Sequence, residues 1–526
     1  MKRPWVLHPS LLGLFAVLFL FGRNMQWLAL GQVIPPAIVV LAGALVLLLL
    51  LTLPLRDVHK AGVLASLLVL SFFSYGRILA VIQGKALWGV VIGKQRYLVL
   101  FFALLIGACT AYLLRTRHKL DNITRLLNVM TAALLMISVV NIVPYQLQKA
   151  RAQGADLEAT DDVQQGTKGT DDLPNIYYII LDGYARQDVL RDLYAYDNSP
   201  FLDHLRGKGF FVAERARSNY CQTSLSLASS LNYSYLDKLA ARVGYDANDR
   251  APLQRAIANS AVVRTLRAHG YHIVAFASGY ADTELRNADR YISMAGRWMP
   301  DAFEQLLLNT TPIPYWAYWL EALPNWADLH RKRLLATLDA LPEAAGEQEG
   351  PVFVFAHIVA PHPPFIFGPQ GEEIEPVGTI GLSDGDHLVK PGLLEAVEYR
   401  RHYRDQLAFI SRRVQGMVDA LLANASRPTV ILLQADHGPG SSLHWEDPAA
   451  TDVRERLAIL SAYYFPDGQS AELYEDITPV NTFRVLLNHY LGTNYPLLED
   501  RSYFSRWKHP YEFLDVTERV TGESIP

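Results

Sequence analysis

The chain has 526 residues, of which 50% are hydrophobic and 19% are charged, and its formal net charge is -4. This mild negative charge, together with the lack of a long basic run, argues against a protein that binds nucleic acid. Two cysteines occur, Cys109 and Cys221, so their number excludes a metal site built on cysteine, while the length allows more than one domain.

Residues 1–147 are dominated by Leu, Val, Ala, Ile and Phe, which predicts a membrane domain. A helix needs about 20 apolar residues to cross a bilayer. Five segments are interpreted as spans: 5–21, 33–55, 61–82, 97–114 and 123–143. Lys2 and Arg3 precede the first as in a signal peptide, but no small-residue cleavage site follows, so we interpret it as a retained span.

Basic residues in the loops predict the orientation of these spans. Arg56 and Lys60 follow the second segment, and Arg115 and Lys119 follow the fourth, which places these loops and the N-terminus in the cytoplasm. The basic loop at 85–96 argues mildly against this orientation. With five spans, we expect a multi-pass protein of the inner (cytoplasmic) membrane whose C-terminal part lies on the periplasmic or extracellular side.

A polar linker and a globular domain follow the spans. Residues 148–174 contain almost no large apolar side chain and many Asp, Gln, Gly and Thr, which predicts a solvated linker. From residue 175, runs typical of buried strands recur, namely NIYYIILDG, YHIVAFAS, VFVFAHIV and TVILLQADHG. Helical patterns alternate with them, so residues 175–526 are predicted to form an α/β domain whose mostly parallel sheet is covered by helices. The tail from residue 477 to residue 526 is interpreted as one more helix and an irregular wrap.

Acidic and imidazole side chains follow three of the predicted strands. Asp182 ends the first strand, Asp436 and His437 follow the last, and His362 lies in the PHPPF segment after the third. Ligands of open α/β sheets collect at the carboxyl ends of the strands. Oxygen and nitrogen donors that meet there suit a divalent metal ion, although each motif alone is also typical of an ordinary turn or capped loop.

The stretch SNYCQTSLSLASSLN (218–232) offers several possible nucleophiles. Thr223 stands where a helical pattern begins, and the N-terminus of a helix favours negative charge. An alkoxide or a phosphoryl group would both be stabilised there. Thr is also a common N-cap, so the sequence alone leaves a structural role for Thr223 open.

The order of these motifs resembles the alkaline phosphatase and sulfatase superfamily: a strand ending in LDG, a Thr at a helix start, a strand leading into His-Pro, and a late ADHG. Together with five spans and a polar linker, it is similar to the lipoteichoic acid synthase branch and to lipid A phosphoethanolamine transferases. The resemblance implies that Asp182, Thr223, Asp436 and His437 bind one divalent metal ion, zinc or manganese, and that Thr223 is the nucleophile.

The resemblance also implies roles for histidines. His362 matches the histidine that contacts the transferred group or the leaving oxygen, so it is expected to be catalytic and substrate-binding. His444, in GSSLHWEDP, falls where related transferases place another substrate-contacting histidine, although an exposed loop histidine is an equal alternative. We interpret His357 as a packed core residue and Arg186 as a surface residue that could also reach an anionic substrate.

Two departures narrow the expected chemistry. Sulfatases that use formylglycine need Pro or Ala at the second position after the modified residue and Arg at the fourth. Cys221 is followed by Gln222, Thr223, Ser224 and Leu225, so this signal is absent and Cys221 is expected to be a small buried residue. A second set of metal ligands, as in alkaline phosphatases proper, is not evident.

The resemblance therefore implies a membrane-bound phosphotransferase. It would move a phospho-head-group from a phospholipid donor to an envelope glycan or lipid acceptor through a phospho-threonine intermediate. Two alternatives stay open at this point. One is a sulfatase-like hydrolase of phosphate or sulfate esters, and the other is a non-catalytic protein of envelope assembly.

Overall fold

The structure is a computed structural model of the whole chain. It describes residues 3–25, 30–82, 85–87, 90–91, 94–153, 173–293, 302–314, 316, 326–346, 348–377, 384–390, 393–468 and 472–522. Two compact units make up the chain. The helical unit comprises Met1–Asp156 and Trp298–Asn325, and the sheet unit comprises Leu157–Arg297 and Trp326–Pro526. Most of the predicted linker, residues 154–172, lies outside the described residues, and the predicted domain bounds stay a prediction.

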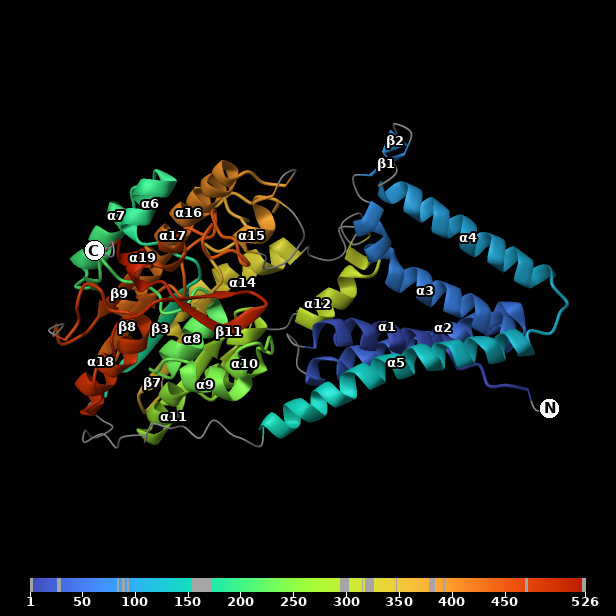
Figure 1. Ribbon diagram of the computed structural model, residues 1–526, viewed down its shortest axis with the longest axis horizontal. Coiled ribbons are helices and arrows are strands. Elements are labelled where there is room, and N and C mark those ends of the chain that lie inside the picture. Colours follow the sequence, from blue (N-terminus) through green and yellow to red (C-terminus); the bar gives the residue numbers. More distant parts are fainter. Residues whose placement is uncertain are drawn as a thin grey trace. The chain divides into compact units, whose positions relative to one another are not determined.

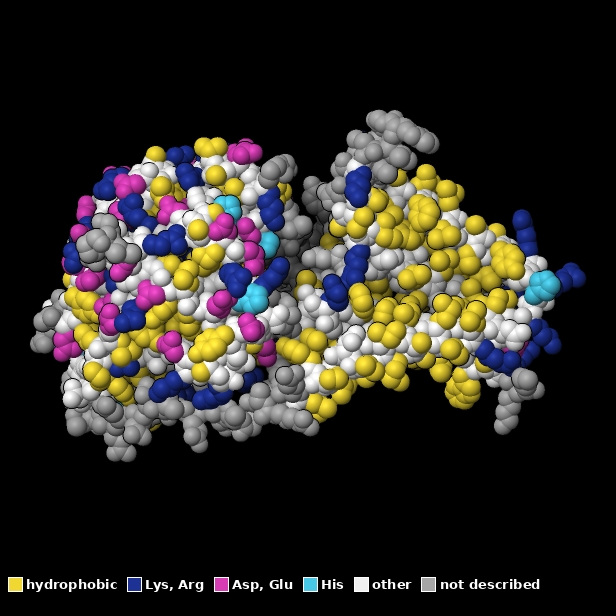
Figure 2. Space-filling view, viewed as in Figure 1, with side chains coloured by type: hydrophobic (Ala, Val, Ile, Leu, Met, Phe, Trp, Pro, Cys, Tyr) yellow, Lys and Arg dark blue, Asp and Glu magenta, His cyan; other side chains and the backbone are white. Residues whose placement is uncertain are grey.

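Long apolar helices build the helical unit. They are α1 (His8–Asn24), α2 (Ile34–Leu55), α3 (Val58–Ile82), α4 (Gln95–Arg115) and α5 (Asp121–Gln153), with the short strands β1 (Ala86–Leu87) and β2 (Val90–Val91) between α3 and α4. Side chains such as Leu49, Leu53 and Leu104 are more than half exposed, and hydrophobic side chains cover much of the visible face of these helices (Figure 2). Such a surface suits contact with lipid.

Four of the described helices are long and apolar enough to cross a membrane: α2 with the preceding turn, α3, α4, and α5 as far as Leu147. They coincide with the last four predicted spans, so the chain is a membrane protein. The predicted first span corresponds to α1, which has 17 residues. A helix of that length rises about 26 Å, somewhat less than the core of about 30 Å, so the fifth span stays a prediction.

A helix from the middle of the chain also belongs to the helical unit. Helix α12 (Ala302–Asn309) contacts α1 and α3 (Figure 1). The Phe303 ring lies edge-on to Phe21, with ring centroids 6.2 Å apart, and the Gly76 N–H donates to the Thr310 carbonyl at 2.9 Å. A Cβ at Gly76 would lie 1.9 Å from the Asn309 carbonyl oxygen, so this close approach requires a glycine.

A seven-stranded sheet forms the centre of the sheet unit. Its order is β4-β9-β8-β3-β7-β5-β6, and the five strands from β8 to β6 are parallel, whereas β9 and β4 pair antiparallel. The strands are β3 (Asn175–Leu181), β4 (Phe211–Val212), β5 (His272–Phe276), β6 (Arg290–Ile292), β7 (Val352–Ile358), β8 (Thr429–Gln434) and β9 (Ser461–Tyr464). All residues of β3, β7 and β8 are buried, as expected for strands covered on both faces.

Helices lie on both sides of this sheet (Figure 1). They are α6 (Gln187–Tyr194), α7 (Ser199–Gly207), α8 (Thr223–Leu231), α9 (Asp237–Val243), α10 (Ala251–Ala258), α11 (Ala261–Ala268), α14 (Trp326–Ala340), α15 (Gly385–Leu388), α16 (Ala396–Asn424), α17 (Val453–Leu457), α18 (Pro479–Leu491) and α19 (Thr517–Thr521). The structure thus confirms the predicted fold class, a helical membrane part followed by an α/β domain with a mostly parallel sheet.

The tail is more regular than predicted. After the expected helix α18, strands β10 (Tyr503–Arg506) and β11 (His509–Asp515) form an antiparallel hairpin instead of an irregular wrap. The Tyr503 ring stacks on Tyr220, with ring centroids 5.5 Å apart. The tail therefore packs against the segment that leads into α8.

Candidate active site

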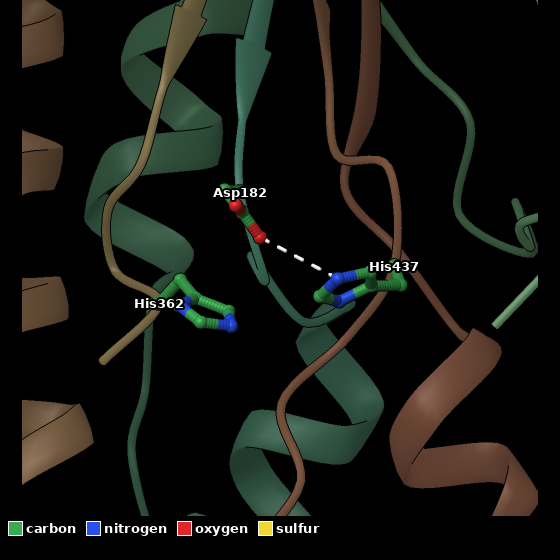
Figure 3. Close-up of side chains that lie close together, drawn as sticks. All are labelled: Asp182, His362 and His437. Carbon is green, nitrogen blue, oxygen red and sulfur yellow. Dashed lines mark ion pairs between the residues drawn. The ribbon is translucent and has the colours of Figure 1, made fainter. Parts of the chain in front are cut away.

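Three neighbouring strands deliver the predicted site residues to one edge of the sheet. β3 lies between β7 and β8, and its last residues align with the last residues of both neighbours. Asp182 follows β3 directly, His362 lies four residues beyond β7, and His437 lies three residues beyond β8. Figure 3 shows the side chains of these three residues pointing toward one another. The topology therefore accounts for their proximity.

Polar atoms converge on the Nε2 atom of His437. This nitrogen lies 3.1 Å from Thr223 Oγ1, 3.5 Å from Asp182 Oδ1 and 3.4 Å from Asp436 Oδ2. Both carboxylate oxygens are buried and have no hydrogen-bond partner. Buried polar atoms are rarely left unpaired, so this pair of oxygens indicates that the site is built for a cation. The oxygen and nitrogen donors fit zinc or manganese.

Thr223 faces this cluster instead of capping its own helix. It is the first residue of α8, Gln222 occupies the N-cap position, and no side chain forms a cap hydrogen bond there. The Thr223 side chain is nearly buried, and its hydroxyl is turned toward His437 Nε2. The structure thus disagrees with the alternative that Thr223 is an N-cap. The neighbouring hydroxyl, Ser224 Oγ, donates to Asp282 at 2.6 Å and is engaged elsewhere.

His357 contacts a proposed metal ligand in addition to packing in the core. It is buried on β7, as expected, but its Nε2 atom lies 3.2 Å from Asp182 Oδ2 and its Nδ1 atom lies 2.8 Å from Thr283 Oγ1. If the threonine hydroxyl donates to Nδ1, the other ring nitrogen carries the proton and donates to Asp182. This contact leaves Asp182 Oδ1 as the oxygen that faces His437, in the manner of partners that orient metal ligands.

Burial and charge act together on the protonation of these groups. Burial alone raises the pKa of Asp182, but the imidazoles of His362, His357 and His437 hold it below its ordinary value. Burial and the Arg456 guanidinium lower the pKa of His437, which favours the neutral ring that binds metal ions. Burial would lower the pKa of His362 too, but the charges of Asp182 and Asp384 raise it to about 9.

Asp384 and Arg456 form a buried ion pair beside His362, and sequence reasoning missed both. Arg456 Nη2 lies 2.7 Å from Asp384 Oδ2, and this oxygen lies 3.9 Å from His362 Nε2. Arg456 also donates to the carbonyls of Cys221 and Gly438. Burial raises the pKa of Asp384, but Arg456 and His362 hold it well below its ordinary value. The pair therefore holds together the segments that carry the cluster.

Replacing Arg456 with methionine is expected to lower the free energy of unfolding by about 3–5 kcal/mol, because the buried Asp384 carboxylate loses its guanidinium partner and the carbonyls of Cys221 and Gly438 lose a donor. Urea unfolding of the purified protein, followed by tryptophan fluorescence, measures this change. The half-exposed Arg506, paired with Glu512, offers a control, since R506M is expected to leave the unfolding midpoint unchanged. Equal midpoints for R456M and the unsubstituted protein would contradict the structural role of this pair.

A pocket of about 180 Å³ opens over the cluster. Besides the predicted site residues Asp182, Thr223, His362 and His437, its lining includes Gln222, Tyr280, Val359, Asp384, His387, Trp445, Arg456 and Trp507. Most of these additional residues come from loops or from the tail hairpin, where no periodic pattern marks them. Gln222, Val359 and Trp445 lie within the stretches SNYCQTSLSLASSLN, VFVFAHIV and GSSLHWEDP, but no pattern assigned these three residues to the site.

Two further residues with a possible substrate-binding role, His444 and Arg186, are not part of this pocket lining. The His444 side chain is exposed, and its backbone N–H donates to Thr451 Oγ1 at 3.0 Å. Its substrate-contacting role stays a prediction. Arg186 pairs with Asp188 at 2.7 Å and donates to the Ala216 carbonyl, so it has a structural role at the start of α6.

Cys221 is fully buried, and burial raises the pKa of its thiol. Its Sγ atom contacts the Ser505 carbonyl at 3.6 Å. A thiol in these surroundings fits the expected packing role.

The profile of the protein family described as Sulfatase matches residues 174–485, more than half of the chain. This range begins at β3 and contains every residue of the cluster. No curated protein sequence matches the chain.

Solved structures that are similar to this chain include two phosphoethanolamine transferases and a phosphonate monoester hydrolase. The C-terminal periplasmic domain of EptC from Escherichia coli, in complex with zinc, is 12% identical over 68% of this chain and 94% of its own, with a TM-score of 0.42. Integral membrane lipooligosaccharide phosphoethanolamine transferase A from Neisseria meningitidis is 12% identical over 92% and 94%, with a TM-score of 0.40. The phosphonate monoester hydrolase of Agrobacterium radiobacter is 15% identical over 63% and 80%, with a TM-score of 0.39. At these scores, the likeness carries no function over to this chain.

Proposed function

This chain belongs to the sulfatase family and is an enzyme of phosphoryl or sulfuryl ester chemistry, and from that premise we propose that it is a phosphotransferase. It moves a phospho-head-group from a phospholipid to a hydroxyl of an envelope glycan or lipid, through a phospho-threonine at Thr223. It works as a multi-pass protein of the inner membrane, with the sheet unit on the periplasmic or extracellular side.

The observation that carries this proposal is the position of the Thr223 hydroxyl. It stands at the first residue of α8, 3.1 Å from His437 Nε2 and beside two buried carboxylate oxygens without partners. The free backbone N–H groups at a helix N-terminus are suited to bind the oxygens of a phosphoryl group. A nucleophile and an anion site thus lie together.

A divalent ion held by Asp182, Thr223, Asp436 and His437 supplies Lewis acidity when bound, which lowers the pKa of a hydroxyl and offsets negative charge. In the first half-reaction, the Thr223 hydroxyl loses its proton to solvent, and Oγ1 forms a bond to phosphorus. The bond from phosphorus to the diacylglycerol oxygen breaks, and the His362 imidazolium donates a proton to that leaving oxygen.

In the second half-reaction, the acceptor hydroxyl gives its proton to His362 while its oxygen attacks phosphorus. The bond between phosphorus and Thr223 Oγ1 breaks, and the Thr223 oxygen regains a proton from solvent. Water in place of the acceptor would give hydrolysis. The acceptor oxygen would reach the intermediate through the pocket that Thr223 and His362 both line.

The test uses the full-length protein in liposomes whose phospholipids carry a labelled head group. We expect diacylglycerol release that rises when a lipid A or glycan acceptor is added, with the label appearing on the acceptor. Label that appears in water at the same rate with and without each acceptor would replace transfer with hydrolysis. The absence of diacylglycerol release from every phospholipid, together with cleavage of a sulfate ester, would overturn the proposal.

A further inference from the structure

The helical unit contains a large cavity that the proposed chemistry does not use. It has a volume of about 840 Å³ and lies between α2, α3 and the segment that begins with α12. Hydrophobic side chains dominate its lining: Val40 and Leu47 come from α2, Phe72 comes from α3, and Leu308 comes from α12. A cavity of this size and character is suited to an apolar ligand.

The cavity is long and follows α2. Its lining on this helix runs from Pro35 to Leu47 and recurs about once per turn, as three pairs of neighbours and then Leu47 alone, so a single face of the helix forms the wall. Twelve residue steps along a helix measure about 18 Å. One leaflet contributes half of a hydrocarbon core of about 30 Å. The cavity therefore extends through about the depth of one leaflet.

One end of the cavity is polar. Glu304 and Thr311 contribute to the lining from the α12 segment. This segment packs at the N-terminal end of α2, because Phe303 and Leu307 share a buried cluster with Val33. The cavity thus has a polar head near the start of α2 and an apolar tail farther along it.

The polar end lies on the side of the membrane where the chemistry is proposed. Arg56 directly follows the C-terminal end of α2, opposite to the end that packs against α12. In the orientation that the basic residues at 56–60 and 115–119 predict, the polar end of the cavity belongs to the outer leaflet. An amphipathic molecule of leaflet length that is abundant in this phase is a phospholipid.

We propose that this cavity binds the acyl chains of the donor phospholipid, with the head group at the Glu304 end. The inference rests on the proposed function, because it assigns to that reaction a site for the lipid part of its donor. Helix α12 forms one wall and belongs to the connection between β6 and β7 of the sheet unit. The lipid is therefore held by a segment that lies, along the chain, between β6 and β7, the strand that His362 follows.

Gly43 allows this cavity to be filled without disturbing the fold. It lines the cavity, and a Cβ built on it meets no atom within 4 Å, so G43F places a ring in the open space. Gly107 on α4 offers the matched control: it also has open space around it, and it is not among the described residues of the lining. G107F therefore adds the same side chain to a different helix.

The experiment compares long-chain and short-chain donors of one head group in nanodiscs and in detergent. We expect G43F to lower the ratio of kcat/KM for the long-chain over the short-chain donor about tenfold, the effect of losing burial of about two methylene groups. G107F is expected to keep the ratio of the unsubstituted protein. Equal ratios in all three proteins would overturn the acyl-chain site.

Photo-crosslinking separates this inference from the proposed function. A phospholipid with a diazirine in its acyl chain is expected to label peptides of α2, α3 and α12 in the unsubstituted protein and in G107F, and to label them several-fold less in G43F. Labelling of these helices without any donor turnover would support the lipid site and overturn the proposed phosphotransferase function. Turnover with labelling that is spread evenly over α4 and α5 would overturn the lipid site alone.

Discussion

Replacing Thr223 with alanine is expected to lower turnover on the order of 10³-fold or more, because the reaction loses its nucleophile. The fold should survive, since the Thr223 side chain makes no cap hydrogen bond and alanine is accepted at the first position of a helix. Steady-state release of diacylglycerol measures the loss. In the metal-free state, thermal unfolding of the variant should match that of the unsubstituted protein.

Two further substitutions test whether the loss of turnover is due to the Thr223 hydroxyl oxygen alone. T223S keeps a hydroxyl at the same position and is expected to retain measurable turnover. S224A removes the adjacent hydroxyl, which donates to Asp282, and is expected to affect stability more than turnover. Mass spectrometry of the protein after incubation with donor should find a phosphoryl adduct on Thr223. Full turnover by T223A would refute the proposed intermediate.

Removing the metal ion and removing one of its proposed ligands are expected to have opposite effects on stability. Chelation should abolish turnover and lower the melting temperature of the unsubstituted protein, because an ion at 100 times its dissociation constant stabilises the fold by about 2.7 kcal/mol. In the metal-free state, D436N is expected to be as stable as the unsubstituted protein or more so. The reason is that Asp182 Oδ1 and Asp436 Oδ2 are buried carboxylate oxygens without partners, and the amide removes one of the two charges.

Metal analysis, together with melting curves recorded with and without zinc or manganese, measures both changes in stability. E446Q neutralises an exposed carboxylate in the loop after β8 and serves as the control, which should bind metal and melt like the unsubstituted protein. A metal-free D436N that melts well below the metal-free unsubstituted protein would argue against a cation site. So would a D436N that retains its metal.

The sequence could predict the cluster because strand ends carry it. Buried strands are readable as continuous apolar runs, and a parallel sheet brings their carboxyl ends to one edge, so Asp182, Asp436 and His437 could be expected to meet. Thr223 could be expected from the start of a helical pattern. Each of these inferences uses local sequence together with a single rule of topology.

The rest of the pocket follows no such rule. Asp384 and Arg456 come from short helices and loops more than 70 residues apart, and Trp507 comes from the tail hairpin. Their contacts depend on how loops pack, and the spacing of hydrophobic residues in the sequence does not predict loop packing. For the same reason, the sequence did not indicate that α12 packs with the membrane helices and not with the α/β domain. The apolar face of a helix does not show which surface will cover it.

The insertion of α12 has a consequence for how the enzyme could be released from its membrane. The chain passes between the two units at 156/157, 297/298 and 325/326, so a single proteolytic cut does not free the sheet unit. A secreted fragment that begins after α5 would still carry the helix, with Phe303 and Leu307 stripped of their buried surroundings. Such a fragment would tend to aggregate or return to a bilayer. Shedding of a soluble enzyme would require excision of the insertion as well.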